Sequence, residues 1–315
     1  MGSARFSPTD WGKFTASSTT GRSTSAIFAG HRLHPDMDPA AISVRESRDS
    51  AANPASTAIM VGLDVTGSMG MLADVIVRDG MRVLFEEIYD RKPVTDPHIL
   101  FAGIGDVACD QAPLQVSQFE ADICLAEQLT KLWLEHGGGG NSSESYDALW
   151  WFAANKTATD CWERRGRKGY LFTVGDEMAP YGLREAEIRK FLAGKDWPGS
   201  IGDMSAADLL AAAESKWNVF HVVVEEGDFA RRQPDAVVAD WQRLLGQRVL
   251  RLADHTKLAE VIVSAIQVAE GSSPDAVVGS WTSKETALAV SRAVEGMTGL
   301  APASKGSPGH LAIPF

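Results

Sequence analysis

Cysteine is scarce in this chain of 315 residues, which contains only Cys109, Cys124 and Cys161. An odd number of cysteines without close spacing excludes a disulfide framework and a zinc site made of four cysteines. The same scarcity is typical of proteins in a reducing compartment.

An excess of positive charge is also lacking, because the formal net charge is -11 and the sequence pI is about 5.1. Nucleic acids and anionic membranes both attract basic surfaces, so we expect neither as a partner. No apolar run approaches the roughly 20 residues that cross a bilayer, and the N-terminal stretch is not apolar enough for a signal peptide. We therefore expect a cytoplasmic protein.

Several enzyme motifs are absent too. The seven histidines form no H-E-x-x-H or H-x-x-x-H pair, which argues against a zinc hydrolase. No G-x-x-x-x-G-K-[ST] is present, so an ATP-binding P-loop is excluded. The Gly-Ser-Met-Gly segment lacks the full G-x-S-x-G of a nucleophile elbow.

The chain divides into three parts by composition. Residues 1–55 are rich in Ser, Thr and Pro and predict an extended arm, with apolar anchors that favour docking on a surface. Residues 56–271 have the regular apolar pattern of a folded domain. Residues 272–315 form a tail with one predicted helix at 283–297.

Apolar runs separated by helical patterns fill the central part. Runs typical of buried strands lie at 57–65, 98–106, 169–177, 218–226 and 248–254, with a short alternating run at 114–119. Helices are predicted after the first run, at 122–136, from about 142, and at 183–194, 204–217, 228–246 and 255–270. This alternation predicts an α/β fold with a mostly parallel sheet covered by helices on both faces.

Polar side chains follow three of these strands. The first ends in Asp64, with Thr66 and Ser68 at the next alternate positions; the second ends in Asp106, and the third in Asp176 and Glu177. In an open α/β sheet, ligands bind outside the carboxyl ends of the strands. The glycine-rich segment 137–145, "GGGGNSSES", can reach the same edge.

A hard divalent cation explains this pattern. Mg²⁺ prefers oxygen ligands and keeps several waters. Asp64 supplies charge, the hydroxyls of Thr66 and Ser68 supply oxygens, and Gly67 allows the tight turn between them. A second loop and a distant aspartate complete the site, which leaves a coordination position open for an acidic group of a partner. The alternative is a strand-to-helix turn in which Asp64 only caps the helix.

"DVTGSM" resembles the D-x-S-x-S metal-ion-dependent adhesion site of the von Willebrand factor A domain. The resemblance covers about 56–271 and implies a doubly wound, Rossmann-like sheet of around six strands, all parallel except a short edge strand. It also implies Mg²⁺, or Mn²⁺ or Ca²⁺, at the rim. Carried over to this chain, it makes Asp64, Thr66 and Ser68 ligands, with Asp176 as the aspartate of the third loop.

The second loop departs from the family pattern, which has a threonine after paired glycines. Asn141 is one candidate for the ligand of this loop, because it directly follows the glycines. Ser143 is the other candidate, because its distance to the segment 147–149 fits the family pattern. Asp106, Glu144 and Glu177 are expected around the ligands rather than among them. For Asp106 and Glu177 the simpler interpretation is a solvated carboxylate at the rim. The adjacent Trp150 and Trp151 predict core packing, with one of them partly exposed.

Three functional hypotheses follow. The first is a binding module, an adaptor or assembly factor whose metal grips an acidic residue of a partner protein; bacterial and phage-borne relatives suggest an AAA+ ATPase. The second is a Mg²⁺- or Mn²⁺-dependent phosphoester hydrolase, which lacks an evident base and nearby cations for phosphate. The third is a structural protein that self-assembles through its arm and tail, with a metal that only braces loops.

Overall fold

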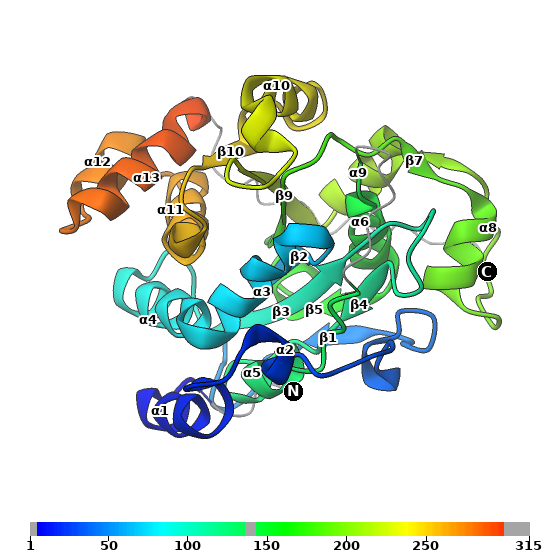
Figure 1. Cartoon of the computed structure of the whole chain (residues 1–315), viewed down its shortest axis with the longest axis horizontal. Helices are drawn as coiled ribbons and strands as arrows, with labels where there is room; N and C mark the ends of the chain where they lie inside the picture. Colours follow the sequence, from blue (N-terminus) through cyan, green and yellow to red (C-terminus); the bar gives the residue numbers. More distant parts are fainter. Residues whose placement is uncertain (1–4, 136–142, 299–315) are drawn as a thin grey trace.

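A six-stranded sheet lies at the centre of the computed structural model, which describes residues 5–135 and 143–298 (Figure 1). Its strands are β2 (Thr57–Asp64), β3 (Pro97–Ile104), β4 (Leu114–Val116), β6 (Gly169–Gly175), β9 (Trp217–Val224) and β10 (Val249–Leu252). They follow the order β10-β9-β6-β2-β3-β4, and only the short edge strand β4 is antiparallel to its neighbour. The prediction of a mostly parallel α/β sheet is confirmed.

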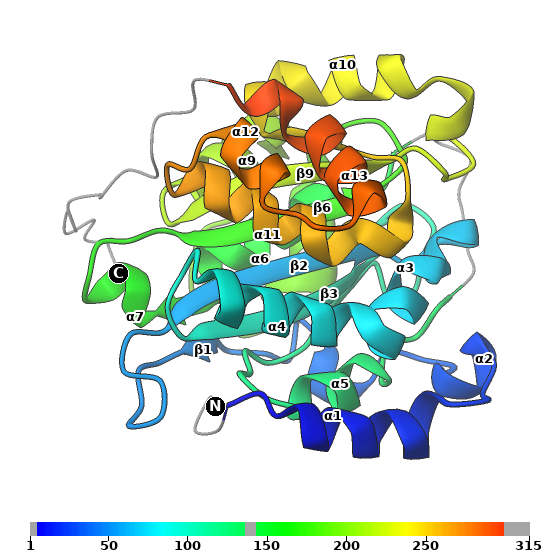
Figure 2. The same cartoon turned by 90° about the vertical axis from the view of Figure 1, so that its left-hand side faces the viewer.

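Helices cover both faces of the sheet (Figures 1 and 2). One face packs against α3 (Gly70–Val75), α4 (Met81–Arg91), α11 (Leu258–Ala269) and α13 (Lys284–Val294). The other face packs against α6 (Tyr146–Asn155), α9 (Ala206–Glu214) and α10 (Pro234–Leu245). Because both faces are covered, β3 and β6 are buried along their whole length, which explains why the strands read as continuous apolar runs.

Shorter elements make up the rest of the secondary structure in the described residues. The remaining α-helices are α1 (Pro8–Phe14), α2 (Thr24–Ile27), α5 (Cys124–Leu129), α7 (Asp160–Glu163), α8 (Glu185–Glu187) and α12 (Pro274–Gly279). Two small sheets pair β1 (Arg45–Ser47) with β5 (Thr157–Thr159) and β7 (Gly182–Leu183) with β8 (Met204–Ser205). No helix within residues 5–135 and 143–298 is long and apolar enough to cross a membrane.

Strand order reverses between β2 and β6, and this point fixes where a ligand can bind. From β2 the chain continues to β3 on one side, whereas β6, which comes later, lies on the other side of β2. The loops after β2 and β6 therefore diverge to opposite faces and leave a crevice at their carboxyl ends. Asp64 is the last residue of β2, and Asp176 directly follows β6.

The N-terminal arm packs on the core, as its apolar anchors favoured, but residues 8–19 and 24–27 are helical, so the prediction of an extended conformation is wrong there. Residues 8–14 and 24–27 are α-helical, and 15–19 form a π-helix. Four apolar side chains of the arm are buried in the core on the α4 side of the sheet: Trp11, Phe14, Ile27 and Phe28. Phe6 also stacks on Phe85 of α4, with ring centroids 5.0 Å apart.

The helix predicted at 122–136 is wrong in extent, because α5 ends at Leu129. The residues after it run alongside the edge strand β4. Gln115 of that strand holds Trp133 by two hydrogen bonds: its side-chain amide donates to the Trp133 carbonyl (2.8 Å) and accepts from the Trp133 amide (2.9 Å). These bonds replace the helical ones that the apolar pattern predicted.

Two further expectations are corrected. Trp150 and Trp151 are both buried, because α6 is enclosed by the sheet and by outer segments of the chain. Trp150 packs against Trp241 of α10, and Trp151 packs against Trp197. Within residues 272–298 the tail contains two helices rather than one, since α12 precedes α13, and both contribute side chains to the hydrophobic core.

Candidate metal centre

The first loop closes on Asp64, whose side chain is fully buried at the end of β2. Its Oδ1 accepts hydrogen bonds from the backbone amide of Thr66 (2.9 Å) and from the Thr66 hydroxyl (2.7 Å). Gly67 follows with φ of 43°, a left-handed conformation that glycine adopts without strain, as the sequence predicted. Ser68 belongs to the short helix Gly67–Met69, but its side chain lies outside the described part of the chain.

Tyr146 holds the Asp64 side chain through a hydrogen bond, a role that the sequence did not predict. The Tyr146 hydroxyl donates to Asp64 Oδ2 at 3.1 Å, and the whole side chain is buried. Its ring meets those of His221 and Trp241 edge-on. A Cβ at Gly175 would stand 2.0 Å from the Tyr146 hydroxyl, so only glycine at the end of β6 leaves room for this contact. A tyrosine that opens the helix after the second loop is the signal for this role.

The third loop holds Asp176 beside the same crevice. Asp176 is 4% exposed, and its Oδ2 accepts a hydrogen bond from the backbone amide of Phe229 in the loop after β9 (2.8 Å). Glu177 is half-buried, and its Oε2 has no hydrogen-bond partner among the described residues. The loop therefore brings two carboxylates to the switch point.

The second loop presents Glu144 to the first loop. Glu144 is 2% exposed, its carboxylate lies near enough to Asp64 for the two charges to repel each other, and its Oε2 has no partner in the described part of the chain. The Ser143 hydroxyl instead faces backbone carbonyls, those of Met178 (3.4 Å) and Ala179 (3.5 Å). Asn141 lies outside the described residues. Glu144, expected near the ligands rather than among them, has the carboxylate that reaches the crevice.

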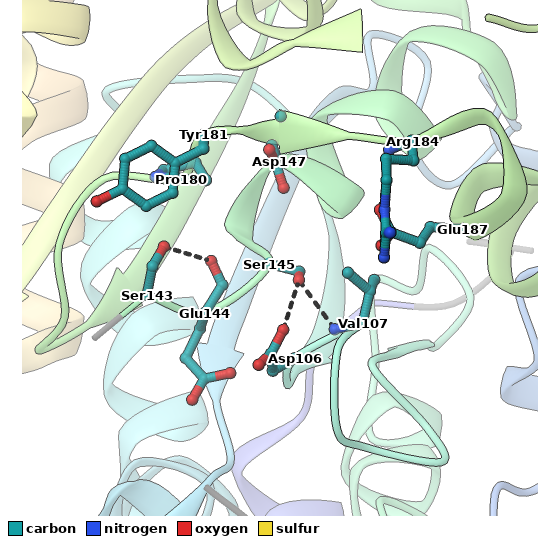
Figure 3. Close-up of a pocket in the computed structure, with 11 residues that line it drawn as sticks. Asp106, Val107, Ser143, Glu144, Ser145, Asp147, Pro180, Tyr181, Arg184 and Glu187 are labelled. Atoms are coloured by element: carbon teal, nitrogen blue, oxygen red, sulfur yellow. Dashed lines mark hydrogen bonds and ion pairs between the residues drawn. The ribbon is translucent and has the colours of Figure 1, made fainter. Parts of the chain in front are cut away.

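Asp106 is not the solvated rim carboxylate of the simpler interpretation, because it is 3% exposed. Its Oδ1 accepts hydrogen bonds from the backbone amide of Ala108 (2.9 Å) and from the Ser145 hydroxyl (3.5 Å) (Figure 3). The Ser145 oxygen also accepts from the backbone amide of Val107 (3.0 Å). Asp106 thereby ties the loop after β3 to the start of α6.

Burial and mutual repulsion make the ionised forms of these carboxylates unfavourable. Burial raises the pKa of Asp64, and the nearby Asp176 and Glu177 raise it further, against the lowering effect of the Thr66 hydrogen bonds. The pKa of Glu144 rises by burial and by repulsion from Asp64, Glu177 and Asp106. Burial raises the pKa of Asp176, and it raises the pKa of Glu177 to about 7.

The residues present fit a divalent cation. Asp64, Glu144, Asp176 and Glu177 make no ion pair with a Lys, Arg or His side chain of the described part of the chain. The buried Oε2 atoms of Glu144 and Glu177 also lack hydrogen-bond donors there. Buried carboxylates in proteins are normally paired with cations or bound to metals. A cation at this point satisfies both requirements.

A second group of residues has tighter ligand spacing. Among the described residues, only Glu226, Asp254 and His255 place three ligand atoms of His, Cys, Asp or Glu within 4.8 Å of one another. These residues follow β9 and β10, and Glu226 is exposed. The carboxylates around Asp64 are more widely spaced, so a cation there would need hydroxyl or water oxygens in addition.

Comparisons with known proteins give structural likeness only. No protein-family model matches the chain, and no curated protein matches it. The open conformation of the pilus adhesin SpaC from Lactobacillus rhamnosus GG aligns with a TM-score of 0.40 and 10% identity, over 75% of this chain and 31% of the adhesin. A von Willebrand factor type A protein from Catenulispora acidiphila aligns with a TM-score of 0.35 and 15% identity, over 76% of this chain and 50% of that one.

The chain therefore spans half or less of the length of each of these structures. The fold is established by the order and direction of the strands in its own sheet.

We predict that Asp64→Asn stabilises the metal-free protein near neutral pH. Because the pKa of Asp64 is raised in the folded state, ionisation of this side chain destabilises the protein. The stabilising contribution of the protonated side chain is fully present below the pKa of about 3.9 in the unfolded chain, and it is lost as pH rises through the pKa in the folded protein. In EDTA, the variant should exceed the wild type in free energy of unfolding by at least ~1 kcal/mol at pH 7.5 and by almost nothing at pH 4. Urea denaturation at both pH values measures this difference.

Asp275→Asn is the matched control, because Asp275 is an exposed residue in the first turn of α12. It should change the free energy of unfolding by less than about 0.5 kcal/mol at either pH. If Asp64→Asn destabilised the protein equally at pH 4 and pH 7.5, the ionised Asp64 would not be unfavourable in the fold.

Proposed function

We propose that this chain is a divalent-metal-dependent protein-binding module of the von Willebrand factor A type. The metal, Mg²⁺ or else Mn²⁺ or Ca²⁺, lies at the carboxyl ends of β2 and β6 and accepts an acidic side chain of a partner protein. The observation that carries the proposal is the convergence of buried carboxylates from three loops, Asp64, Glu144 and Asp176, which no Lys, Arg or His side chain within residues 5–135 and 143–298 pairs with.

The donor set supports a hard cation. Asp64, Glu144 and Asp176 offer carboxylate oxygens and Thr66 offers a hydroxyl; Ser68 and Asn141 stay predicted ligands whose side chains lie outside the described part. When bound, the metal supplies positive charge and an open coordination position for an oxygen of the partner. The chain's own residues hold that position: Tyr146 and Thr66 orient Asp64, and the Phe229 amide orients Asp176.

Binding is favoured over phosphoester hydrolysis by the charges around the site. A phosphate needs cationic side chains besides the metal. The wall beside the carboxylates has Asp106, Glu144 and Asp147, and the one basic residue among its described residues, Arg184, is paired with Glu187. A single carboxylate on a protein has less charge to neutralise than a phosphoester.

The identity of the partner stays a proposal. The family resemblance suggests an AAA+ ATPase, with the present chain as its adaptor or assembly factor. Self-assembly through the arm is less favoured, because Trp11 and Phe14 are already buried against the chain's own core.

We predict that the protein binds one Mg²⁺ and that Asp64→Asn abolishes this binding in titration calorimetry. Removal of one ligand charge with Glu144→Gln should weaken Mg²⁺ binding by about tenfold or more, because Glu144 presents its carboxylate to the first loop. Ser143→Ala should weaken it by less than about threefold, because the Ser143 hydroxyl faces backbone carbonyls.

Glu226→Gln is the control for the second group of ligands and should leave Mg²⁺ binding unchanged. If Glu226→Gln abolished binding while Asp64→Asn did not, the metal would lie after β9 and β10 and the proposal would be wrong. A larger effect of Ser143→Ala than of Glu144→Gln would contradict the assignment within the second loop.

Partner capture tests the function itself. We expect the immobilised wild-type protein to retain a partner from an extract of its source cells in Mg²⁺, and to lose at least about nine-tenths of it in EDTA. Asp64→Asn should lose the same partner in Mg²⁺, because the partner's acidic group then has no metal to bind. Equal retention in all three conditions would contradict the proposed function.

A further inference from the structure

A cavity of about 340 Å³ opens beside the carboxylates of the candidate metal centre. Its walls come from the loop after β3, the second loop, the first turn of α6 and the segment 180–187 (Figure 3). A volume near the lower end of the range for ligand pockets suits one side chain rather than a cofactor.

Asp147 is the unexplained residue of this cavity. It lies in the first turn of α6, it is 1% exposed, and it lines the cavity. Nearby backbone amides, those of Gly182 and Ala148 among them, lower the pKa of Asp147, but its Oδ2 has no hydrogen-bond partner among the described residues. Burial has the larger effect and raises the pKa of Asp147 to about 7. In Figure 3 its carboxylate lies between Tyr181 and Arg184.

The walls of the cavity have an acidic excess. Asp106, Glu144 and Asp147 line it, and Glu144 Oε2 is a second buried oxygen without a donor in the described part of the chain. Among the lining residues that the structure describes, Arg184 is the one basic side chain, and it is 75% exposed and engaged with Glu187. The Arg184 guanidinium is therefore already paired with a carboxylate of its own segment.

An aromatic ring stands beside the acidic wall. Tyr181 lines the cavity and is 83% exposed, far more than a tyrosine packed within a fold. The face of an exposed aromatic ring attracts cations by the charge distribution of its π system. The ring and the buried carboxylate of Asp147 thus favour the same class of ligand.

We propose that this cavity binds a cationic side chain, arginine or lysine, of the partner protein. Asp147 accepts its hydrogen bonds, and Tyr181 covers its apolar stem and charged head. The site rests on the proposed function in one respect: the same partner offers its acidic group to the metal and its basic group to Asp147. A buried carboxylate oxygen without a donor is costly, and a charged donor group from outside removes that cost.

The test titrates N-acetyl-L-arginine amide into the full-length protein and follows backbone amide shifts by NMR, with N-acetyl-L-citrulline amide as the neutral probe of the same shape. We expect saturable shifts at Ala148 and Gly182 with the arginine probe alone. Asp147→Asn should weaken this binding by about tenfold or more, because it removes the charge that the donor group meets. Tyr181→Ala should weaken it by about threefold.

Asp275→Asn, at the equivalent turn of α12, is the matched control and should bind the arginine probe like the wild type. Shifts of equal size with the citrulline probe, absence of saturable shifts at Ala148 and Gly182, or unchanged affinity in Asp147→Asn would each overturn the proposal. Should Asp147→Asn not fold, two measurements test the proposal instead: the comparison of the two probes on the wild-type protein, and the affinity of Tyr181→Ala for the arginine probe.

A Mg²⁺ titration of the same samples separates this site from the metal. Normal Mg²⁺ binding without arginine binding would refute the proposed site for a cationic side chain and leave the proposed function intact. Arginine binding that depends on Asp147, in a protein that does not bind Mg²⁺, would keep the cationic site and remove the metal-dependent function.

Discussion

Buried carboxylates lie close together at the carboxyl ends of β2 and β6, and the rest of the candidate site is arranged around their mutual repulsion. Asp64 is fully buried, and Asp176 and Glu144 approach it from two other loops. Each carboxylate raises the free energy of its neighbours in the ionised form, so the arrangement is costly without a cation. A fold that keeps such a cluster gains from it only when something positive binds there.

The scaffold around the cluster is built to hold this unfavourable arrangement. The reversal of strand order between β2 and β6 opens the crevice, and the first turn of α6 contacts Asp64 there through Tyr146. Tyr146 fixes Asp64 through a space that Gly175 leaves at the end of β6. Rigid support of this kind keeps like charges close together without collapse of the loops, which is what a preorganised binding site requires.

The sequence predicted the parts of this site that depend on strand ends. Asp64 and Asp176 directly follow buried apolar runs, and a parallel sheet brings such positions to one edge. The second loop was harder, because Ser143 and Glu144 are adjacent and loop conformation alone decides which of them faces the crevice. The distance to the segment 147–149 favoured Ser143, whereas the structure turns the carboxylate of Glu144 inward. The contact between Tyr146 and Asp64 could not be predicted, because apolar periodicity indicates burial but not the polar contacts of a buried side chain.

The position of the cation tests this account most directly. Anomalous diffraction from a crystal grown with MnCl₂ locates a bound Mn²⁺ without assumptions about its ligands. The account predicts one strong peak among Asp64, Thr66 and Asp176, at the ends of β2 and β6. A crystal whose only peak lies beside Glu226 and His255, or one with no peak at saturating MnCl₂, would contradict it.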